Sequence, residues 1–129
     1  MIGCAAAVIG NCIIGALYYH PKSPSGKVWL RRVFPGKALD DIDNGFAMGF
    51  AIIVNIMMVL LLRFILIDTF GAVNFMDGLK LGVGLWCLTL MLEISHVMFA
   101  HRSVDVFVIE QVHSLISMAV SGVCVVTLG

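Results

Sequence analysis

The sequence predicts an all-α integral membrane protein, a single domain (residues 1–129) in which four antiparallel transmembrane helices form a bundle. The first observation behind this prediction is composition: 60% of the residues are hydrophobic, 12% are charged, and the mean hydropathy is +1.04. A soluble domain of this size needs far more polar surface. The second is that the apolar residues fall into four runs, each close to the roughly 20 residues with which a helix crosses the hydrocarbon core.

The four predicted spans cover about residues 2–19, 45–67, 78–100 and 104–128. The first span is apolar from its beginning, with no basic segment before it and no clear small-x-small cleavage site. We therefore interpret it as a retained span rather than as a cleaved signal peptide.

The first connection, residues 20–44, is the one long polar segment, and it predicts a short interfacial helix. Within it, residues 28–34 combine aromatic side chains suited to the headgroup region with arginines that face lipid phosphate. Tyrosines at the end of the first span extend the same aromatic belt. The residues expected to meet lipid headgroups are Trp29, Arg31, Arg32, Tyr18 and Tyr19.

The distribution of basic residues predicts the orientation of the chain. With four spans, the first and third connections lie on one side of the membrane. They carry most of the basic residues, namely Lys22, Lys27, Arg31, Arg32, Lys37 and Arg102. By the positive-inside rule these connections face the cytoplasm, or the matrix in a mitochondrion, and both termini lie on the other side. The sequence fits a plasma membrane and a mitochondrial inner membrane equally well.

Small residues recur at four-residue spacing in three of the spans, as Gly45 with Gly49, Gly78 with Gly82, and Ser117 with Ser121. Such rows let helix backbones approach closely, because packing and hydrogen bonds drive helix association inside lipid. We expect these rows to pack the helices of one chain together, in preference to forming a dedicated homodimer face.

The motif Glu-x-x-His occurs twice in otherwise apolar spans, as Glu93 with His96 and as Glu110 with His113. Residues three apart share one face of a helix. Counted from a turn near Arg102, each glutamate lies within about 3 Å in depth of the histidine on the other helix. An antiparallel hairpin is therefore expected to pair each glutamate with the opposite histidine.

Serines on the last span, Ser114, Ser117 and Ser121, extend this polar cluster and leave three interpretations of it. The first is structural, with hydrogen bonds between Glu and His across the two helices. The second is a metal site, because two Glu-x-x-His helices form half of a di-iron carboxylate centre. The third is a path for protons or small ions.

We favour the structural interpretation of the cluster and expect no metal or other cofactor. The first two spans offer only Asn11 and Asn55 in place of the bridging carboxylates that a di-iron centre needs. Each of these asparagines stands alone on an apolar helix and is expected to make an interhelical hydrogen bond.

Two segments carry a family resemblance. GALYYHPKSPSGKVWLR contains Tyr-Tyr-x-Pro followed by Gly-Lys-x-Trp, and MFAHRSVDVFVIEQVHSLISMAVSGV contains a Phe-x-x-Arg turn. The chain thereby resembles the DUF1761 family, with matches at Tyr18, Tyr19, Pro21, Gly26, Lys27, Trp29, Phe99, Arg102, Ile109 and Gly122. The resemblance implies a four-helix membrane domain and no assigned function, and Glu93 and Glu110 lie outside the motif.

The chain has almost no mass outside its predicted spans, so a water-soluble substrate has little to bind to. We expect a non-catalytic accessory or assembly subunit of a larger membrane complex, such as an energy-transducing one, or a small homo-oligomer. The expected partners are the lipid bilayer, proteins within the membrane and a bound lipid. No nucleic acid is expected, because eight basic residues balance eight acidic ones.

The alternative is an autonomous function centred on the Glu/His cluster. Ionisable side chains inside a membrane often mark ion and proton pathways. In that case the protein would be a small transporter, a proton-conducting element or a metal-dependent membrane protein that uses Glu93, His96, Glu110 and His113.

Overall fold

The computed structural model describes residues 1–42 and 44–129, and within these residues every regular element is a helix. In chain order the helices are α1 (Ile2–Tyr18), α2 (Pro24–Val33), η1 (Leu39–Asp41), α3 (Gly45–Leu61), η2 (Leu62–Leu66), α4 (Ile67–Phe70), α5 (Phe75–Phe99) and α6 (Val104–Leu128). The π-helical turn η2 joins α3 and α4 into one continuous helix. The predicted all-α class is confirmed.

Three helices are long and apolar enough to cross a membrane, namely Gly45–Phe70, Phe75–Phe99 and Val104–Leu128. They coincide with the last three predicted spans, and the first of them runs a few residues beyond its predicted end. α1 is also apolar but has 17 residues, at the short end of the range that crosses a bilayer. The structure therefore supports a membrane protein and shows three of the four predicted spans at full length among the described residues.

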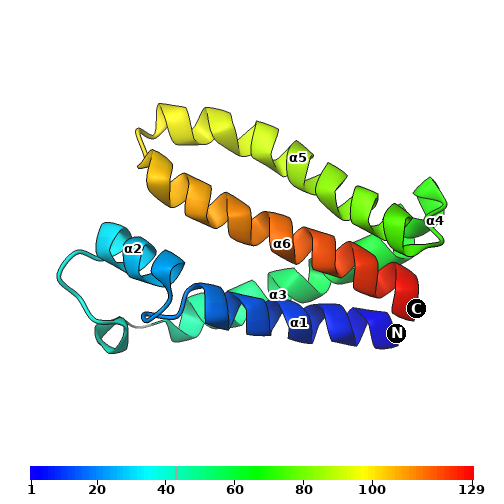
Figure 1. Cartoon of the computed structure of the whole chain (residues 1–129), viewed down its shortest axis with the longest axis horizontal. Coiled ribbons are helices and arrows are strands. Elements are labelled where there is room, and N and C mark those ends of the chain that lie inside the picture. The colour runs from blue at the N-terminus through cyan, green and yellow to red at the C-terminus, as the bar shows by residue number, and fades with distance from the viewer. Residues whose placement is uncertain (43) are drawn as a thin grey trace.

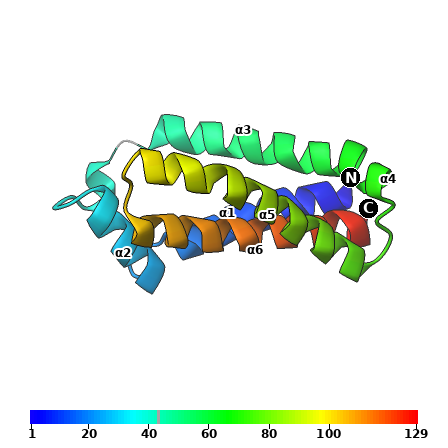
Figure 2. The ribbon, with the colours of Figure 1, turned by 90° about the horizontal axis from the view of Figure 1, so that it is seen from above.

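α6 lies in the middle of the molecule, packed along α5 on one side and α1 on the other (Figure 1). α3 packs against α1 behind this layer, and α5 and α6 form a hairpin (Figure 2). In the turn of this hairpin His101 has a φ of 51°, the left-handed conformation that often ends a helix. The two chain termini meet at one end of the molecule, which we call the terminal end.

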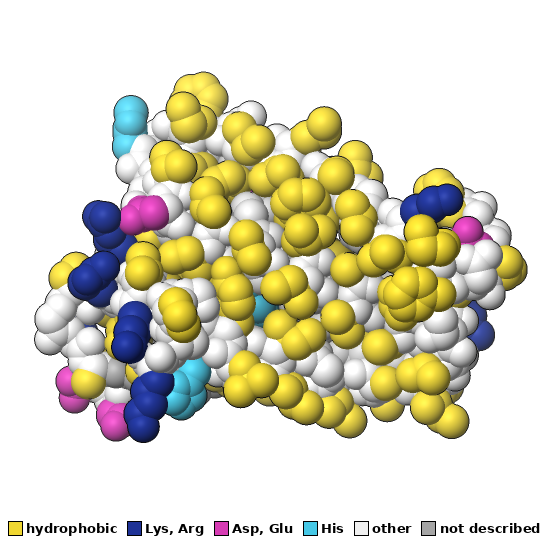
Figure 3. Space-filling view, viewed as in Figure 1, with side chains coloured by type: hydrophobic (Ala, Val, Ile, Leu, Met, Phe, Trp, Pro, Cys, Tyr) yellow, Lys and Arg dark blue, Asp and Glu magenta, His cyan; other side chains and the backbone are white. Residues whose placement is uncertain are grey.

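The opposite end, which we call the basic end, carries α2. Figure 3 shows Lys and Arg side chains gathered there, while hydrophobic side chains cover the long middle of the same face. α2 itself supplies Lys27, Arg31 and Arg32. The molecule thus has the apolar belt and the charged end that the sequence predicts for a membrane protein.

α5 and α6 approach so closely that no side chain fits at the glycines between them. A Cβ atom built on Gly78 would lie 2.6 Å from the carbonyl oxygen of Gly122, and one built on Gly82 would collide with the carbonyl oxygen of Met118. Around Gly49 on α3, in contrast, nothing lies within 4 Å of such a Cβ. The row of Gly78 and Gly82 therefore packs two helices of one chain, as expected.

The interior differs between the two ends of the molecule. The apolar core cluster lies toward the terminal end and joins α1, α3, η2, α4 and α6 through Cys4, Ala7, Val59, Leu62, Ile67 and Val125. Toward the basic end the interior carries polar side chains, among them Asn11, Gln111 and Ser121, each less than one-tenth exposed. The buried polar side chains thus lie beside the apolar core cluster, while Val97 and Val106 are buried near the hairpin turn.

α2 begins four residues before the helix that the sequence predicts. Ser23 caps it by accepting a hydrogen bond from the backbone N–H of Gly26 (3.0 Å). Pro24 suits the first helical position, where no backbone N–H is needed. The prediction followed the amphipathic run alone and missed the start signal that Ser23 and Pro24 provide.

Candidate functional site

Glu93 lies on α5 with an exposed side chain, and Gln111 on α6 is its hydrogen-bond partner. The side-chain amide of Gln111 donates from Nε2 to Glu93 Oε2. Helical side chains tilt toward the N-terminus of their helix, so those of α5 tilt toward the terminal end and those of α6 toward the basic end. Glu93 and Gln111 therefore reach toward each other.

The predicted pairing of Glu93 with His113 is wrong, because the glycine contacts set a different register for the hairpin. Gly82 faces Met118, and continuing this register places Glu93 level with Phe107. His113 then lies about 9 Å further along α6, at a rise of about 1.5 Å per residue. The prediction counted depth along each helix from the turn near Arg102 and so did not include this shift of α5 relative to α6.

Glu110 joins α6 to α2 and to the turn of the hairpin. Its Oε1 accepts a hydrogen bond from the indole N–H of Trp29 (3.4 Å), and its Oε2 lies 3.5 Å from Arg102 Nη2. Among the described residues no hydrogen bond or ion pair joins it to His96, so the second predicted Glu–His pair is also wrong. Glu110 instead holds α2 over the basic end of α6.

A second contact between the same elements is the ion pair of Arg32 with Asp105, at 3.0 Å. Both side chains are about half exposed, so solvent screens the pair and its contribution to stability is small. The Trp29–Glu110 hydrogen bond is part-buried and is therefore the better anchor for α2.

An aromatic cluster surrounds His113 and turns it toward α1. Its ring centroid lies 5.4 Å from that of Tyr18 and 5.0 Å from that of Tyr19. Trp29 packs on Tyr19 at 5.2 Å and on Phe34 at 5.9 Å. Three of the residues predicted to form an aromatic belt thus form one cluster, which covers His113 at the basic end.

Asn11 and Asn55 make the interhelical hydrogen bonds that the sequence predicts. Asn11 Nδ2 donates to Asn55 Oδ1 (3.0 Å) and to Ser121 Oγ (2.8 Å). Asn55 Nδ2 donates in turn to the carbonyl oxygen of Val8 (3.4 Å). One amide group therefore links α1, α3 and α6 in the middle of the molecule.

The other predicted site residues are dispersed. His96 is exposed on α5, Arg31 is exposed on α2, and Ser114 is half-buried on α6. Ser117 is half-buried with its hydroxyl oxygen fully enclosed. Within residues 1–42 and 44–129, no three His, Cys, Asp or Glu side chains lie close enough together to hold a metal ion.

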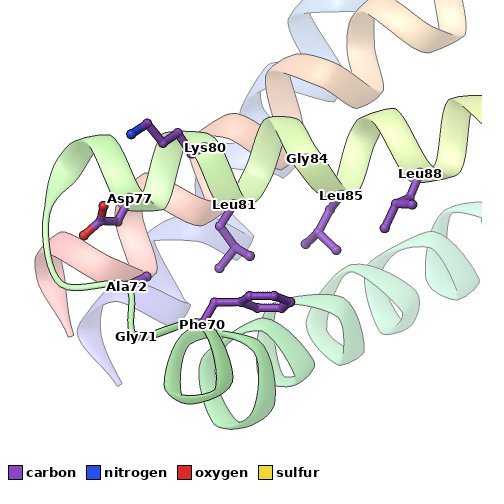
Figure 4. Close-up of a pocket in the computed structure, with 9 residues that line it drawn as sticks. All are labelled: Phe70, Gly71, Ala72, Asp77, Lys80, Leu81, Gly84, Leu85 and Leu88. Atoms are coloured by element: carbon purple, nitrogen blue, oxygen red, sulfur yellow. The ribbon is translucent and has the colours of Figure 1, made fainter.

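A groove of about 430 Å³ lies at the terminal end, where α4 and its following loop face α5 (Figure 4). Leu81, Leu85 and Leu88 point from α5 toward the ring of Phe70 across it. Lys80 also lines the groove, but Figure 4 shows its side chain directed to the other side of α5 from the leucines and Phe70. The groove is therefore apolar along its length, with one acidic and one basic residue, Asp77 and Lys80, at one end.

Comparison with known proteins identifies the family. A family model described as "Protein of unknown function (DUF1761)" matches residues 2–126. The chain belongs to the DUF1761 family. The resemblance found in its sequence motifs is thereby confirmed. Comparisons with curated proteins and with solved structures give no match.

The first motif of this DUF1761 protein forms the corner between α1 and α2. Tyr18 and Tyr19 stand at the end of α1, and Trp29 on α2 packs against Tyr19. A Cβ atom built on Gly26 would collide with the carbonyl oxygen of His20, so only glycine fits at this position. The motif therefore has a structural role here: it folds α2 back onto the helix bundle.

Sequence reasoning missed one polar residue of the DUF1761 chain, Gln111. Gln111 binds Glu93 through its side chain, and its backbone carbonyl accepts a hydrogen bond from the indole N–H of Trp86 (3.0 Å). The available signal was a second polar residue directly after Glu110 in an apolar run. Attention to the Glu-x-x-His spacing left Gln111 out.

Proposed function

We propose that this DUF1761 protein is a four-helix transmembrane bundle without catalytic activity. In this proposal it serves as an accessory or assembly subunit of a larger membrane complex, such as an energy-transducing one, or forms a small homo-oligomer. α1 is the fourth crossing helix and runs antiparallel to α6. Its contacts with α6 support this role, because they extend from Gly3 beside Cys124 to the hydrogen bond that Tyr18 donates to the carbonyl oxygen of Ile109 (2.7 Å).

The observation that carries the proposal is the exposure of Glu93 and His96 on α5. Both lie within the last turns of a helix long enough to span a membrane, and both tilt away from the basic end toward the membrane interior. Ionisable side chains that face lipid at such depths are costly. Gln111 supplies one hydrogen bond to Glu93, and the carboxylate has capacity for more. A partner helix with polar groups at this depth would remove the cost.

The same proposal places the basic end at the cytoplasmic or matrix surface and both termini on the opposite side. The gathering of Lys and Arg around α2 supports this orientation (Figure 3). α2 then lies at the interface, where Arg31 and Arg32 meet lipid phosphate while Trp29, Tyr18 and Tyr19 form the aromatic belt.

The groove between α4 and α5 is the proposed site of a bound lipid. Leu81, Leu85 and Phe70 provide an apolar wall for an acyl chain. The groove opens at the terminal end, so the lipid belongs to the leaflet on the side of the termini.

The alternative, an autonomous transporter or proton conductor, draws on the polar residues of α6. Glu110, His113, Ser117 and Ser121 follow one another toward the terminal end. The apolar core cluster lies beyond them. A polar row that ends against apolar packing favours a membrane subunit over a conduit through the bilayer.

Photo-cross-linking from α5 tests the proposed function. A benzoylphenylalanine at position 96 should cross-link in native membranes to one defined protein, either another subunit or a second copy of the chain. The control is the same probe in place of Phe46, which is 89% exposed on α3 at the basic end and should give no such product. The double change Glu93→Gln with His96→Asn should reduce the protein subunits recovered with the chain. Cross-links from position 96 to lipid alone would contradict the proposal.

A further inference from the structure

Four buried polar atoms have no hydrogen-bond partner within the described part of the chain, namely Asn11 Oδ1, Gln111 Oε1, His113 Nε2 and Ser117 Oγ. Asn11 is only 7% exposed and Gln111 only 6%. A buried polar group without a partner keeps the full cost of its desolvation, and in folded proteins nearly all such groups are satisfied. Another molecule is therefore needed to meet these atoms.

Three of the four atoms lie in one row between α1 and α6. A Cβ atom built on Gly15 would lie 3.5 Å from His113 Nε2, so these two residues face each other across the helix pair. Asn11 lies one turn before Gly15, and Ser117 lies one turn after His113. Because the two helices run in opposite directions, Asn11 and Ser117 are level as well. The hydrogen bond from Asn11 to Ser121 continues the row (2.8 Å).

We infer that this row is a hydration site, a short file of buried water molecules held between α1 and α6 by His113 Nε2, Ser117 Oγ and Asn11 Oδ1. The chemistry of the three atoms selects water. An amide oxygen only accepts hydrogen bonds, whereas a hydroxyl group both donates and accepts and an imidazole nitrogen does one or the other. Water can do both, and a buried water molecule typically makes about three hydrogen bonds.

The surroundings close the file at both ends. The rings of Tyr18 and Tyr19 pack around His113 at the basic end. Toward the terminal end Asn11 Nδ2 already donates hydrogen bonds to Asn55 and Ser121, and the apolar core cluster follows. Between these limits the backbone of Gly15 faces the imidazole, and a Cβ atom there would lie 3.5 Å from His113 Nε2. The file therefore reaches from His113 to about the middle of α6 and does not cross the membrane.

Water-edited solid-state NMR of the full chain in phospholipid bilayers tests the inference, because it measures how fast polarisation moves from water to each side chain. The side chains of His113 and Ser117 should gain signal as fast as those of the exposed first connection. Val59 and Val125 of the apolar core cluster should gain it several-fold more slowly. Rates for His113 and Ser117 that equal those of Val59 and Val125 would overturn the hydration site.

Substitutions distinguish water bound in the row from water that enters the whole helix bundle, because only the former depends on Ser117. Ser117→Ala should reduce the rate at His113 several-fold and leave the rate at Val125 unchanged. Ser114→Ala is the matched control, because Ser114 lies on α6 outside the row. This variant should leave the rate of polarisation transfer from water to His113 near that of the original protein. Equal effects of the two variants on His113 would contradict the file. If a variant fails to fold, the comparison of His113 and Ser117 with Val59 and Val125 in the unaltered protein still tests the hydration site.

Discussion

At the scale of single residues, Asn11 is the polar side chain with the most defined role. Its amide group hydrogen-bonds to α3 and α6 at once, through Asn55 and Ser121. Inside a membrane such contacts contribute about 0.6 kcal/mol on average and rarely more than about 1.7. Asn11 therefore stabilises the packing of three helices by a small but measurable amount.

Replacing Asn11 with valine should lower the free energy of unfolding by about 1 kcal/mol, because two interhelical hydrogen bonds are lost and Asn55 Oδ1 loses its donor. Reversible unfolding in mixed micelles measures this difference. Ile9→Val on the outer face of the same helix is the control, since Ile9 is 59% exposed, and it should change stability little. Equal effects of the two substitutions would contradict the role assigned to Asn11.

The sequence predicted the asparagine contacts and missed the partners of the glutamates, for a physical reason. A lone amide in an apolar helix has few polar partners, so an interhelical hydrogen bond could be expected for Asn11 and for Asn55 without naming the partner. The partners of Glu93 and Glu110 depend on the register of the hairpin and on the tilt of each side chain. Neither follows from spacing along one helix.

At the scale of helices, the glycines of α5 decide how closely α6 approaches. Gly82 lies where a methyl group would collide with a backbone carbonyl oxygen of α6, whereas Gly84 has nothing within 4 Å of the same position. The two residues stand half a turn apart on one helix. They form a matched pair for testing helix packing.

Gly82→Ala should destabilise the protein by about 1–3 kcal/mol, because the helices must separate to admit the methyl group. Gly84→Ala should leave stability unchanged or raise it by up to about 1 kcal/mol, because alanine is the better helix former. Unfolding of both variants in the same mixed micelles measures the contrast. A smaller loss for Gly82→Ala than for Gly84→Ala would show that α5 and α6 do not pack at Gly82.

The attachment of α2 provides a second test at this scale. Trp29→Phe keeps the aromatic packing on Tyr19 and removes the hydrogen bond to Glu110. With a loss of about 1 kcal/mol, the backbone amides of α2 should exchange with solvent about fivefold faster. Hydrogen exchange read by mass spectrometry measures this, with the amides of α6 near Val125 as the unchanged internal control. Unchanged exchange in α2 would show that the indole hydrogen bond does not anchor it.

At the scale of the whole molecule, the orientation of the chain depends on α1 crossing the membrane. An N-terminal tag and a C-terminal tag should both react with an impermeant reagent on the side away from the cytoplasm or matrix. A cysteine in place of Lys37 should react from the other side, because basic connections stay on the cytoplasmic or matrix side. If α1 did not cross, the N-terminal tag would appear on the same side as position 37.

Composition and hydropathy were sufficient to predict the all-α class and three helices long and apolar enough to cross a membrane, because the thickness of the bilayer fixes how long an apolar helix must be. They could not predict which residues of α1, α3 and α6 form the apolar core cluster and which make polar contacts beside it. Those contacts depend on packing between segments that are distant in the sequence, as the hydrogen bonds of Asn11 with α3 and α6 show.

The central claim is that this DUF1761 protein works as part of an assembly within the membrane. Extraction from native membranes in a mild detergent, followed by the mass and protein content of the particle that carries the chain, tests it most directly. The proposal predicts a particle of fixed composition that contains further protein subunits or further copies of the chain. A particle that holds one copy of this chain, with detergent and lipid alone, would contradict it.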